Sequence, residues 1–349
     1  MGADEVHAAD VKEADEYARA YFPGVPAPEL ASPILLSAGE QRDVEFPVRK
    51  GGLSDVVGAL ELPDSAKYLD FLLLVEKESP GSWSFVASGK VRGGQFRLRN
   101  FSPGIYGLMA YTEGEPKWFA DYTLEIGTKP VTHISIPVER PVDLSGSVRA
   151  AKDAGELPPG ALAGIKVSLN PVKRIAVMGE SDSADVKPDG MFKIAGVYAG
   201  WYFVSLHGLP KGWGIVEQRY KNGEAMNAGI SIDGAMADNS LMFVVSPKLA
   251  RVSVRVRDRD DKPVAGAKVV LLPEKMPALF SPWALRLSVS DENGGVSFEG
   301  LAPGRYKPVL LEGSEAKRDR DIELLRSKAA QVDPVEVRGG QGLVVSVAE

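Results

Sequence analysis

The sequence predicts an all-β protein made of three tandem Ig-like or prealbumin-like β-sandwich units, preceded by a short helix-containing segment. A single sequence pattern occurs three times. Each copy ends in a tyrosine, and these tyrosines lie 96 and 104 residues apart, at Tyr106, Tyr202 and Tyr306. That spacing corresponds to one small domain per copy. Short apolar-alternating stretches with turn signals between them are typical of sandwiches. The copies read GGQFRLRNFSPGIY at 93–106, DGMFKIAGVYAGWY at 189–202 and NGGVSFEGLAPGRY at 293–306.

Each copy begins with a strand in which apolar and polar residues alternate, and this alternation then shifts by one residue. In the second copy Phe192 and Ile194 share one face, but the next apolar residue is Val197. One residue must therefore leave the ladder, and the aligned positions hold Asn100, Gly196 and Gly300. These residue types tolerate positive φ, so the pattern predicts a β-bulge at each position.

The end of each copy predicts a tight connection and a second strand. Ser102-Pro103-Gly104-Ile105 and Ala302-Pro303-Gly304-Arg305 place Pro and Gly as in a type II turn, and the middle copy keeps the Gly. The strand that follows begins near the tyrosine. We expect that ring to enter the core while its hydroxyl bonds a backbone group near the turn.

The copies also close alike, with a short strand, a glycine and a last strand at 124–138, 230–246 and 335–349. A similar stretch stands near the front at 32–48, after a segment at 11–24 whose apolar residues share a helical face. The third copy has a matching helical stretch at 318–331. The front of the chain therefore resembles the end of a further repeat.

These patterns divide the chain into four parts. Residues 1–48 are interpreted as the tail of a preceding repeat, with a helix and closing strands. The three sandwich repeats are placed at 49–139, 140–247 and 248–349.

Two motifs resemble a known family. The repeated Gly-aromatic, Pro-Gly, Tyr pattern and the opening DDKPVAGAKVVL at 260–271 are similar to the carboxypeptidase regulatory-like family, a prealbumin-like sandwich related to collagen-adhesin B-type repeats. Tandem copies with a segment like AYFPG at 20–24 resemble large secreted or envelope proteins of soil bacteria. The resemblance implies a sandwich fold, export and accessory or adhesive work, without catalytic residues.

The composition narrows the range of partners. The chain has 349 residues, no cysteine and a net charge of −6, so disulfides and thiolate chemistry are excluded. Residues 1–30 carry seven acidic residues against Lys12 and Arg19. There is no basic stripe for nucleic acid and no run of apolar residues long enough for membrane insertion. No signal peptide begins this sequence, and we expect an extracellular, cell-surface or periplasmic location from the resemblance.

Few residues could carry catalysis or bind a metal. The three histidines, His7, His133 and His207, form no known catalytic or metal-binding spacing. Acidic clusters at 258–261 and 291–293 could bind Ca²⁺ or could shape hairpin turns, and turn formation is the simpler interpretation. The sequence predicts no catalytic residue, no cofactor and no metal site.

The second copy differs from the others in its aromatic residues. Tyr198, Trp201 and Trp213 lie near one loop end, where sugar rings could stack on them. The alternative is packing at a joint between domains. The sequence therefore predicts a non-enzymatic spacer, adhesive or assembly module whose partner is protein, either itself or another envelope component. The alternative is a polysaccharide-binding accessory protein that uses these three residues.

Overall fold

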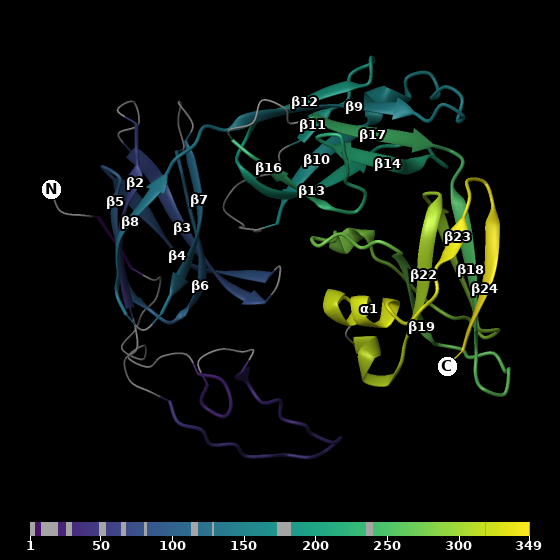
Figure 1. Cartoon of the computed structure of the whole chain (residues 1–349), viewed down its shortest axis with the longest axis horizontal. Helices are drawn as coiled ribbons and strands as arrows, with labels where there is room; N and C mark the ends of the chain where they lie inside the picture. Colours follow the sequence, from purple (N-terminus) through teal and green to yellow (C-terminus); the bar gives the residue numbers. More distant parts are fainter. Residues whose placement is uncertain are drawn as a thin grey trace. The chain divides into compact units, whose positions relative to one another are not determined.

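The computed structural model describes residues 4–7, 20–25, 30–48, 54–63, 68–79, 82–112, 118–127, 129–172, 183–234, 240–317 and 319–348. The chain forms two compact units. The first comprises Met1–Val142, Lys173–Gly179 and Tyr198–Gly200, and the second comprises Asp143–Val172, Glu180–Val197 and Trp201–Glu349. The predicted all-β class is confirmed, because strands in small stacked sheets dominate both units (Figure 1).

The first sandwich stacks two four-stranded sheets. One has the order β1 (Asp4–His7), β5 (Gln95–Phe101), β2 (Ser54–Glu61), β8 (Val131–Pro137), and the other has the order β4 (Ser82–Arg92), β3 (Tyr68–Ser79), β6 (Gly104–Tyr111), β7 (Phe119–Ile126). Alternate residues of both sheets, among them Val56, Leu98 and Leu108, form its core. This follows from the period of two along each strand.

The second sandwich repeats this arrangement within the second unit. Its larger sheet has the order β12 (Met191–Val197), β9 (Val142–Ala150), β17 (Ser240–Ser246), β14 (Gly214–Tyr220), β15 (Gly223–Glu224). The facing sheet has the order β11 (Ser183–Asp185), β10 (Lys166–Pro171), β13 (Gly200–His207), β16 (Gly229–Ile232). Phe192 and Phe243 lie in its core with ring centroids 6.4 Å apart.

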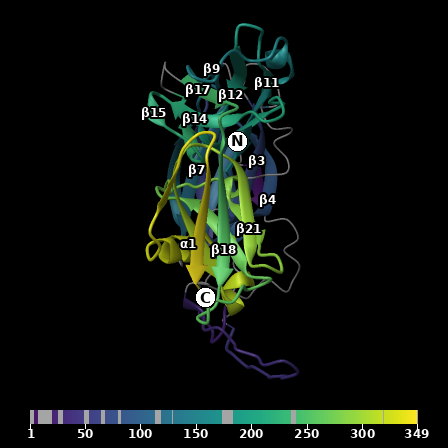
Figure 2. The same cartoon turned by 90° about the vertical axis from the view of Figure 1, so that its right-hand side faces the viewer.

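The third sandwich pairs a three-stranded sheet with a four-stranded one (Figure 2). The first has the order β21 (Gly295–Leu301), β18 (Ala250–Arg257), β24 (Gly342–Ala348), and the second has the order β20 (Arg286–Val289), β19 (Lys268–Pro273), β22 (Gly304–Leu311), β23 (Val335–Val337). In all three sandwiches the first strand pairs in parallel with the last, as β2–β8, β9–β17 and β18–β24 do. The repeated sequence pattern therefore produces a repeated topology.

Helix α1 (Ile322–Ala329) covers the outer face of the third sandwich. Strand β19 is buried on both faces, because Val269 and Leu271 enter the sandwich core while Val270 and Leu272 pack with Leu325 of the helix. Asp321 caps the helix by accepting a hydrogen bond from the Leu324 N–H at 3.1 Å. The helical stretch predicted within 318–331 is thus confirmed.

The predicted bulges are present where the parity changes. Pairing of β2 with β5 and of β18 with β21 shifts register next to Phe101 and Leu301, respectively. Gly196 and Gly300 have φ of 70° and 68°. Asn100 lies within the shift of the first sandwich, and its own backbone angle remains a prediction. The bulge lets the strand bend and turns the next apolar residue back into the core.

The predicted type II turn is wrong. Gly200 and Gly304 have φ of 149° and 159°, far from the value of about +80° that such a turn needs. A type II turn would reverse the chain within one sheet. Here two residues link the bulged strand to a strand of the opposite sheet, as β5 to β6 and β21 to β22, and the chain bends at the second of them.

The tyrosine after the crossing takes the predicted role in the first and third sandwiches. Tyr106, Tyr202 and Tyr306 are all third in their strands, β6, β13 and β22. The Tyr106 hydroxyl donates to the Ser102 carbonyl at 2.9 Å, and the Tyr306 hydroxyl donates to the Ala302 carbonyl at 2.8 Å. Each bond ties the strand back to the first residue of its crossing. Burial raises the pKa of Tyr306, which keeps that hydroxyl a donor.

The front of the chain differs from the prediction. Within the described stretch 30–48 no strand forms, and Leu35 and Leu36 are exposed, so the closing strands predicted there are wrong for this chain. A strand needs a partner to satisfy its backbone groups, and this stretch pairs with none. The predicted helix at 11–24 lies mostly outside the described residues. Asp4–His7, in contrast, form β1 and dock on β5.

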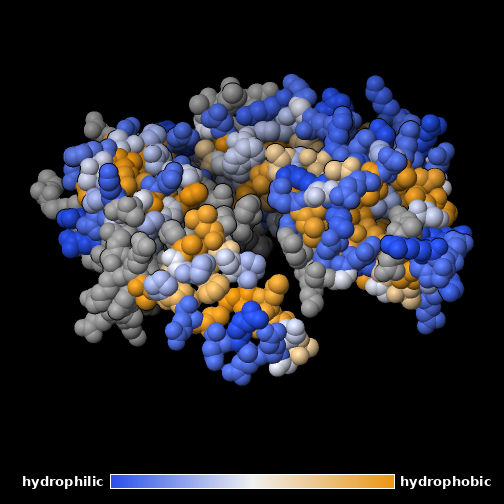
Figure 3. Space-filling view, turned by 60° about the horizontal axis from the view of Figure 1, so that its bottom comes forward, coloured by the Kyte–Doolittle hydropathy of each residue, from blue (hydrophilic) through white to orange (hydrophobic). Residues whose placement is uncertain are grey.

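The described surface alternates apolar and hydrophilic residues, with orange and blue interspersed on the face seen in Figure 3. Among the described residues, no helix has the length and apolar character of a transmembrane span.

Replacing Tyr106 or Tyr306 by Phe is expected to lower the free energy of unfolding by about 1 kcal/mol, because a part-buried carbonyl loses its donor. Urea denaturation followed by circular dichroism measures this. Tyr122→Phe is the control, since Tyr122 is 37% exposed. An unchanged stability in both core variants would show that the hydroxyl bonds are not structural.

Candidate functional site

The three aromatic residues predicted as a glycan platform lie in different surroundings. Tyr198 stacks on Phe119 within the first compact unit, with ring centroids 4.6 Å apart and planes at 27°. Trp201 is 53% exposed, whereas Trp213 is half-buried. One face of Tyr198 is therefore already covered by a ring of the protein. Trp201 presents the most open aromatic surface of the three.

The acidic clusters act as turn formers. One oxygen of Asp258 accepts the N–H groups of Asp260 and Lys262, each at 2.9 Å. One oxygen of Asp291 accepts those of Asn293 and Gly295, at 2.9 and 2.8 Å. These bonds organise the hairpin backbone, as the simpler interpretation of the sequence held. Among the described residues, no group of three His, Asp or Glu side chains is placed to hold a metal ion.

The most developed site in the second unit is a joint between the second and third sandwiches. The long loop 274–285, between β19 and β20, reaches the edge strand β16 and bridges Ala228 to Phe280. The Gly229 N–H donates to Leu279 O at 2.9 Å, and the Ser281 N–H donates to Asn227 O at 2.8 Å. The joint is thus a short piece of antiparallel sheet.

Side chains close around this backbone pairing. Phe280 is 5% exposed, and Trp283 packs edge-on against Phe203 with centroids 5.6 Å apart. A Cβ on Gly229 would lie 2.3 Å from a methyl carbon of Leu279. A larger residue at this position would have to displace the Leu279 side chain.

Helix α1 holds the loop from the other side. The Arg326 guanidinium donates to the carbonyls of Pro277 and Ala278 at 2.6 and 2.8 Å. It also pairs with Glu323 one turn earlier, at 2.9 Å. A charged donor with several N–H groups can satisfy two neighbouring carbonyls at once. The helix therefore positions the loop that makes the joint.

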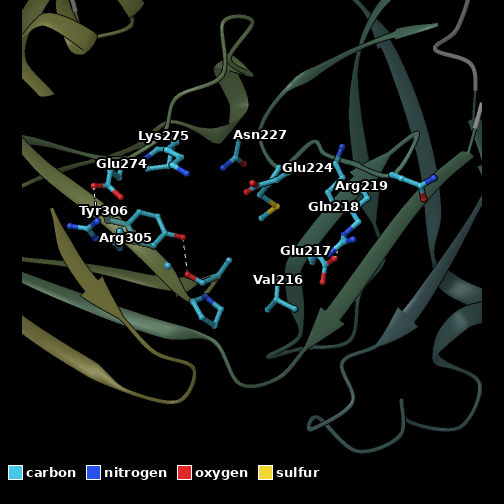
Figure 4. A pocket seen from close by; sticks show the side chains of 16 residues that line it. Val216, Glu217, Gln218, Arg219, Glu224, Asn227, Glu274, Lys275, Arg305 and Tyr306 are labelled. Carbon is cyan, nitrogen blue, oxygen red and sulfur yellow. Dashed lines mark hydrogen bonds and ion pairs between the residues drawn. The ribbon is translucent and has the colours of Figure 1, made fainter. Parts of the chain in front are cut away.

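Next to the joint lies a cleft of about 530 Å³ (Figure 4). Its walls are residues 216–219 of β14 with 222, 224, 226 and 227 on one side, and residues 273–275 with 302–306 on the other. The second wall is the crossing that ends in Tyr306. The repeated motif of the third sandwich thus faces the second sandwich.

The cleft is lined by charges, and most of them are paired. Glu217 pairs with Arg219 along β14, and Glu274 pairs with Arg305 at 3.0 Å. The Glu274 N–H also donates to Arg305 O at 2.8 Å, so backbone and side chain hold the same two residues together. In Figure 4, Lys275 and Glu224 extend into the cleft from opposite walls.

This arrangement favours binding over catalysis. The Tyr306 hydroxyl is committed to Ala302 O, and its pKa is raised by burial. Two of the three glutamates are held in ion pairs with arginines. The cleft offers carboxylate, ammonium and amide groups to polar partners, with volume for a small molecule or a few side chains.

Sequence reasoning missed both the joint and the cleft. They are built from segments far apart in the sequence, β14 and the loop after β19 among them. One signal was available: the third copy carries Arg305 where the first has Ile105, and a charge at that position predicts a polar neighbour.

The comparisons with known proteins assign no functional site to this chain. No family model and no curated protein matches the chain. Among solved structures it is similar to GBS52, the minor pilin of Streptococcus agalactiae, at 12% identity over 59% of this chain and 94% of that chain, with a TM-score of 0.28. A streptococcal ancillary pilin has 12% identity over 74% and 90%, with a TM-score of 0.22.

The TIE protein of Bacillus anthracis is a further similar structure, at 12% identity over 85% of this chain, with a TM-score of 0.23. The chain spans about half the length of that protein, 50%. At such identities and TM-scores these similarities carry no conclusion about this chain. The carboxypeptidase regulatory-like assignment remains a prediction.

Proposed function

We propose that this chain is a non-enzymatic structural protein of the bacterial cell surface or periplasm, in which tandem sandwiches act as a stiff spacer or assembly module. The observation that carries the proposal is the joint of the second unit. Its sandwiches are joined by main-chain hydrogen bonds at Gly229 and Ser281 as well as by side chains. An enzyme needs one organised cleft, whereas a spacer needs joints that resist bending.

The covalent link at this joint is also short. Residues 247–249 separate β17 from β18. Lys248 within this link pairs with Asp153 at 3.1 Å, and Leu249 packs against Gly214. A short link combined with a paired loop leaves two attachment points. Two attachments restrict rotation in a way that a single flexible linker does not.

The spacer proposal predicts a single fixed distance across the joint. Met191→Cys and Val344→Cys place spin labels on exposed positions of the two sandwiches, and the chain has no other cysteine. Double electron–electron resonance should give one narrow distance distribution. Phe280→Ala should broaden it, because the loop loses its buried anchor.

The matched control is Leu287→Ala, on β20 and 40% exposed, which should leave the distribution narrow. Circular dichroism confirms that each variant is folded. A broad distribution in the otherwise unmodified chain would contradict the stiff spacer.

A second candidate is polysaccharide binding through the aromatic residues of the second repeat, and it is favoured by the 53% exposure of Trp201. A glycan array of the full chain separates the two functions. The spacer proposal predicts no signal above background. Binding that disappears in Trp201→Ala but persists in Trp283→Ala, which is 54% exposed, would establish the second candidate instead.

A further inference from the structure

The outer edge of the first sandwich is already covered by a strand from the front of the chain. Strand β1 pairs in parallel with β5, with Asp4, Glu5, Val6 and His7 opposite Phe96, Arg97, Leu98 and Arg99. An uncovered strand edge exposes unpaired N–H and C=O groups that accept another strand. Four residues of this chain are thus suited to strand addition.

The other two sandwiches have the same edge without such a cover. Strands β12 and β21 correspond to β5, since each pairs with the first strand of its sandwich and ends at the same bulge. Each is the outermost strand of its sheet in the described part of the chain. Their inward residues are buried like those of β5: Phe192 and Ile194 are 2% and 3% exposed.

Strand β12 also matches β5 in charge at one position, the one opposite Glu5. The position opposite Glu5 is Arg97 in β5, Lys193 in β12 and Ser297 in β21. Lys193 pairs with Asp143 at 2.6 Å as Arg97 does with Asp55 at 3.3 Å, and its side chain stays 56% exposed. Strand β21 instead carries Glu299, 64% exposed, opposite the place of His7. Glu299 is itself paired with Arg251. The difference therefore lies opposite Glu5, which meets a cation on β12 and an uncharged serine on β21.

We propose that the β12 edge of one copy receives residues Asp4–His7 of a second copy, in parallel and with Glu5 opposite Lys193. The pairing deepens the proposed assembly role, on which it rests, by naming the partner as this same chain. Because the donor lies in the first sandwich and the acceptor in the second, the contact is heterologous. Repetition of such a contact extends into a filament unless it closes into a ring.

The pairing competes with the one already made. A strand tethered to its own β5 acts at an effective concentration in the millimolar range. Exchange onto β12 of another copy therefore grows with protein concentration. Weakening the internal pairing should favour the exchange.

Disulfide trapping tests the register directly, because the native chain has no cysteine. The full chain carrying His7→Cys is mixed with a second full chain carrying Ala195→Cys. Ala195 is the exposed position of β12 that takes the place of Arg99. Mild oxidation should produce a crosslinked dimer on a non-reducing gel. The control acceptor is Glu299→Cys, at the equivalent position of β21. It should crosslink more slowly, because Ser297 of β21 offers Glu5 no positive charge in place of Lys193.

Charge reversal separates this pairing from random collision. Lys193→Glu in the Ala195→Cys acceptor should slow crosslinking, whereas Lys187→Glu, an exposed control with the same change in net charge, should not. Arg97→Glu in the donor should speed it by releasing β1. Equal rates for Ala195→Cys and Glu299→Cys, or no effect of Lys193→Glu, would overturn the proposal. Either failure leaves the spin-label result for the joint unaffected, so the spacer proposal is judged separately.

Discussion

The second unit depends on the hydrogen bonding of one loop, whose Phe280 side chain is buried. Backbone N–H and C=O groups that leave water must find partners, and loop 274–285 finds them on two sides: the edge of β16 and the guanidinium of Arg326. With those groups satisfied, Phe280 can be buried. The helix, the loop and the neighbouring sandwich are then mechanically linked, since Arg326 belongs to α1 and Asn227 to the second sandwich.

Every sandwich contains the same kind of crossing between its two sheets. A bulge ends one strand, two residues with a bend cross to the opposite sheet, and a tyrosine bonds back to the first of those two residues in the first and third copies. In the third copy this crossing also forms one wall of the charged cleft. In the third copy, therefore, the motif that closes the sandwich also faces the second sandwich, and Arg305 stands there where the first copy has Ile105.

The sequence predicts the parts of this structure that depend on local periodicity. Alternation of Phe192 and Ile194, the parity change at Gly196 and the partner of Tyr106 are local signals, and the structure bears them out. The type II turn was wrong because dipeptide preference does not reveal that the two strands lie in different sheets. Strand β1 and the joint escaped prediction because each requires a partner distant in sequence, and an acidic four-residue stretch carries no alternation strong enough to mark it.

Hydrogen exchange at the joint tests the central claim most directly, because the Gly229 and Ser281 amides are the ones that bond across it. If the two sandwiches form one stiff element, these amides exchange as slowly as amides in the core strands β13 and β19, since they open only with the sandwiches themselves. Exchange at the rate of an open loop, while β13 and β19 stay protected, would show that the sandwiches move independently and would contradict the account.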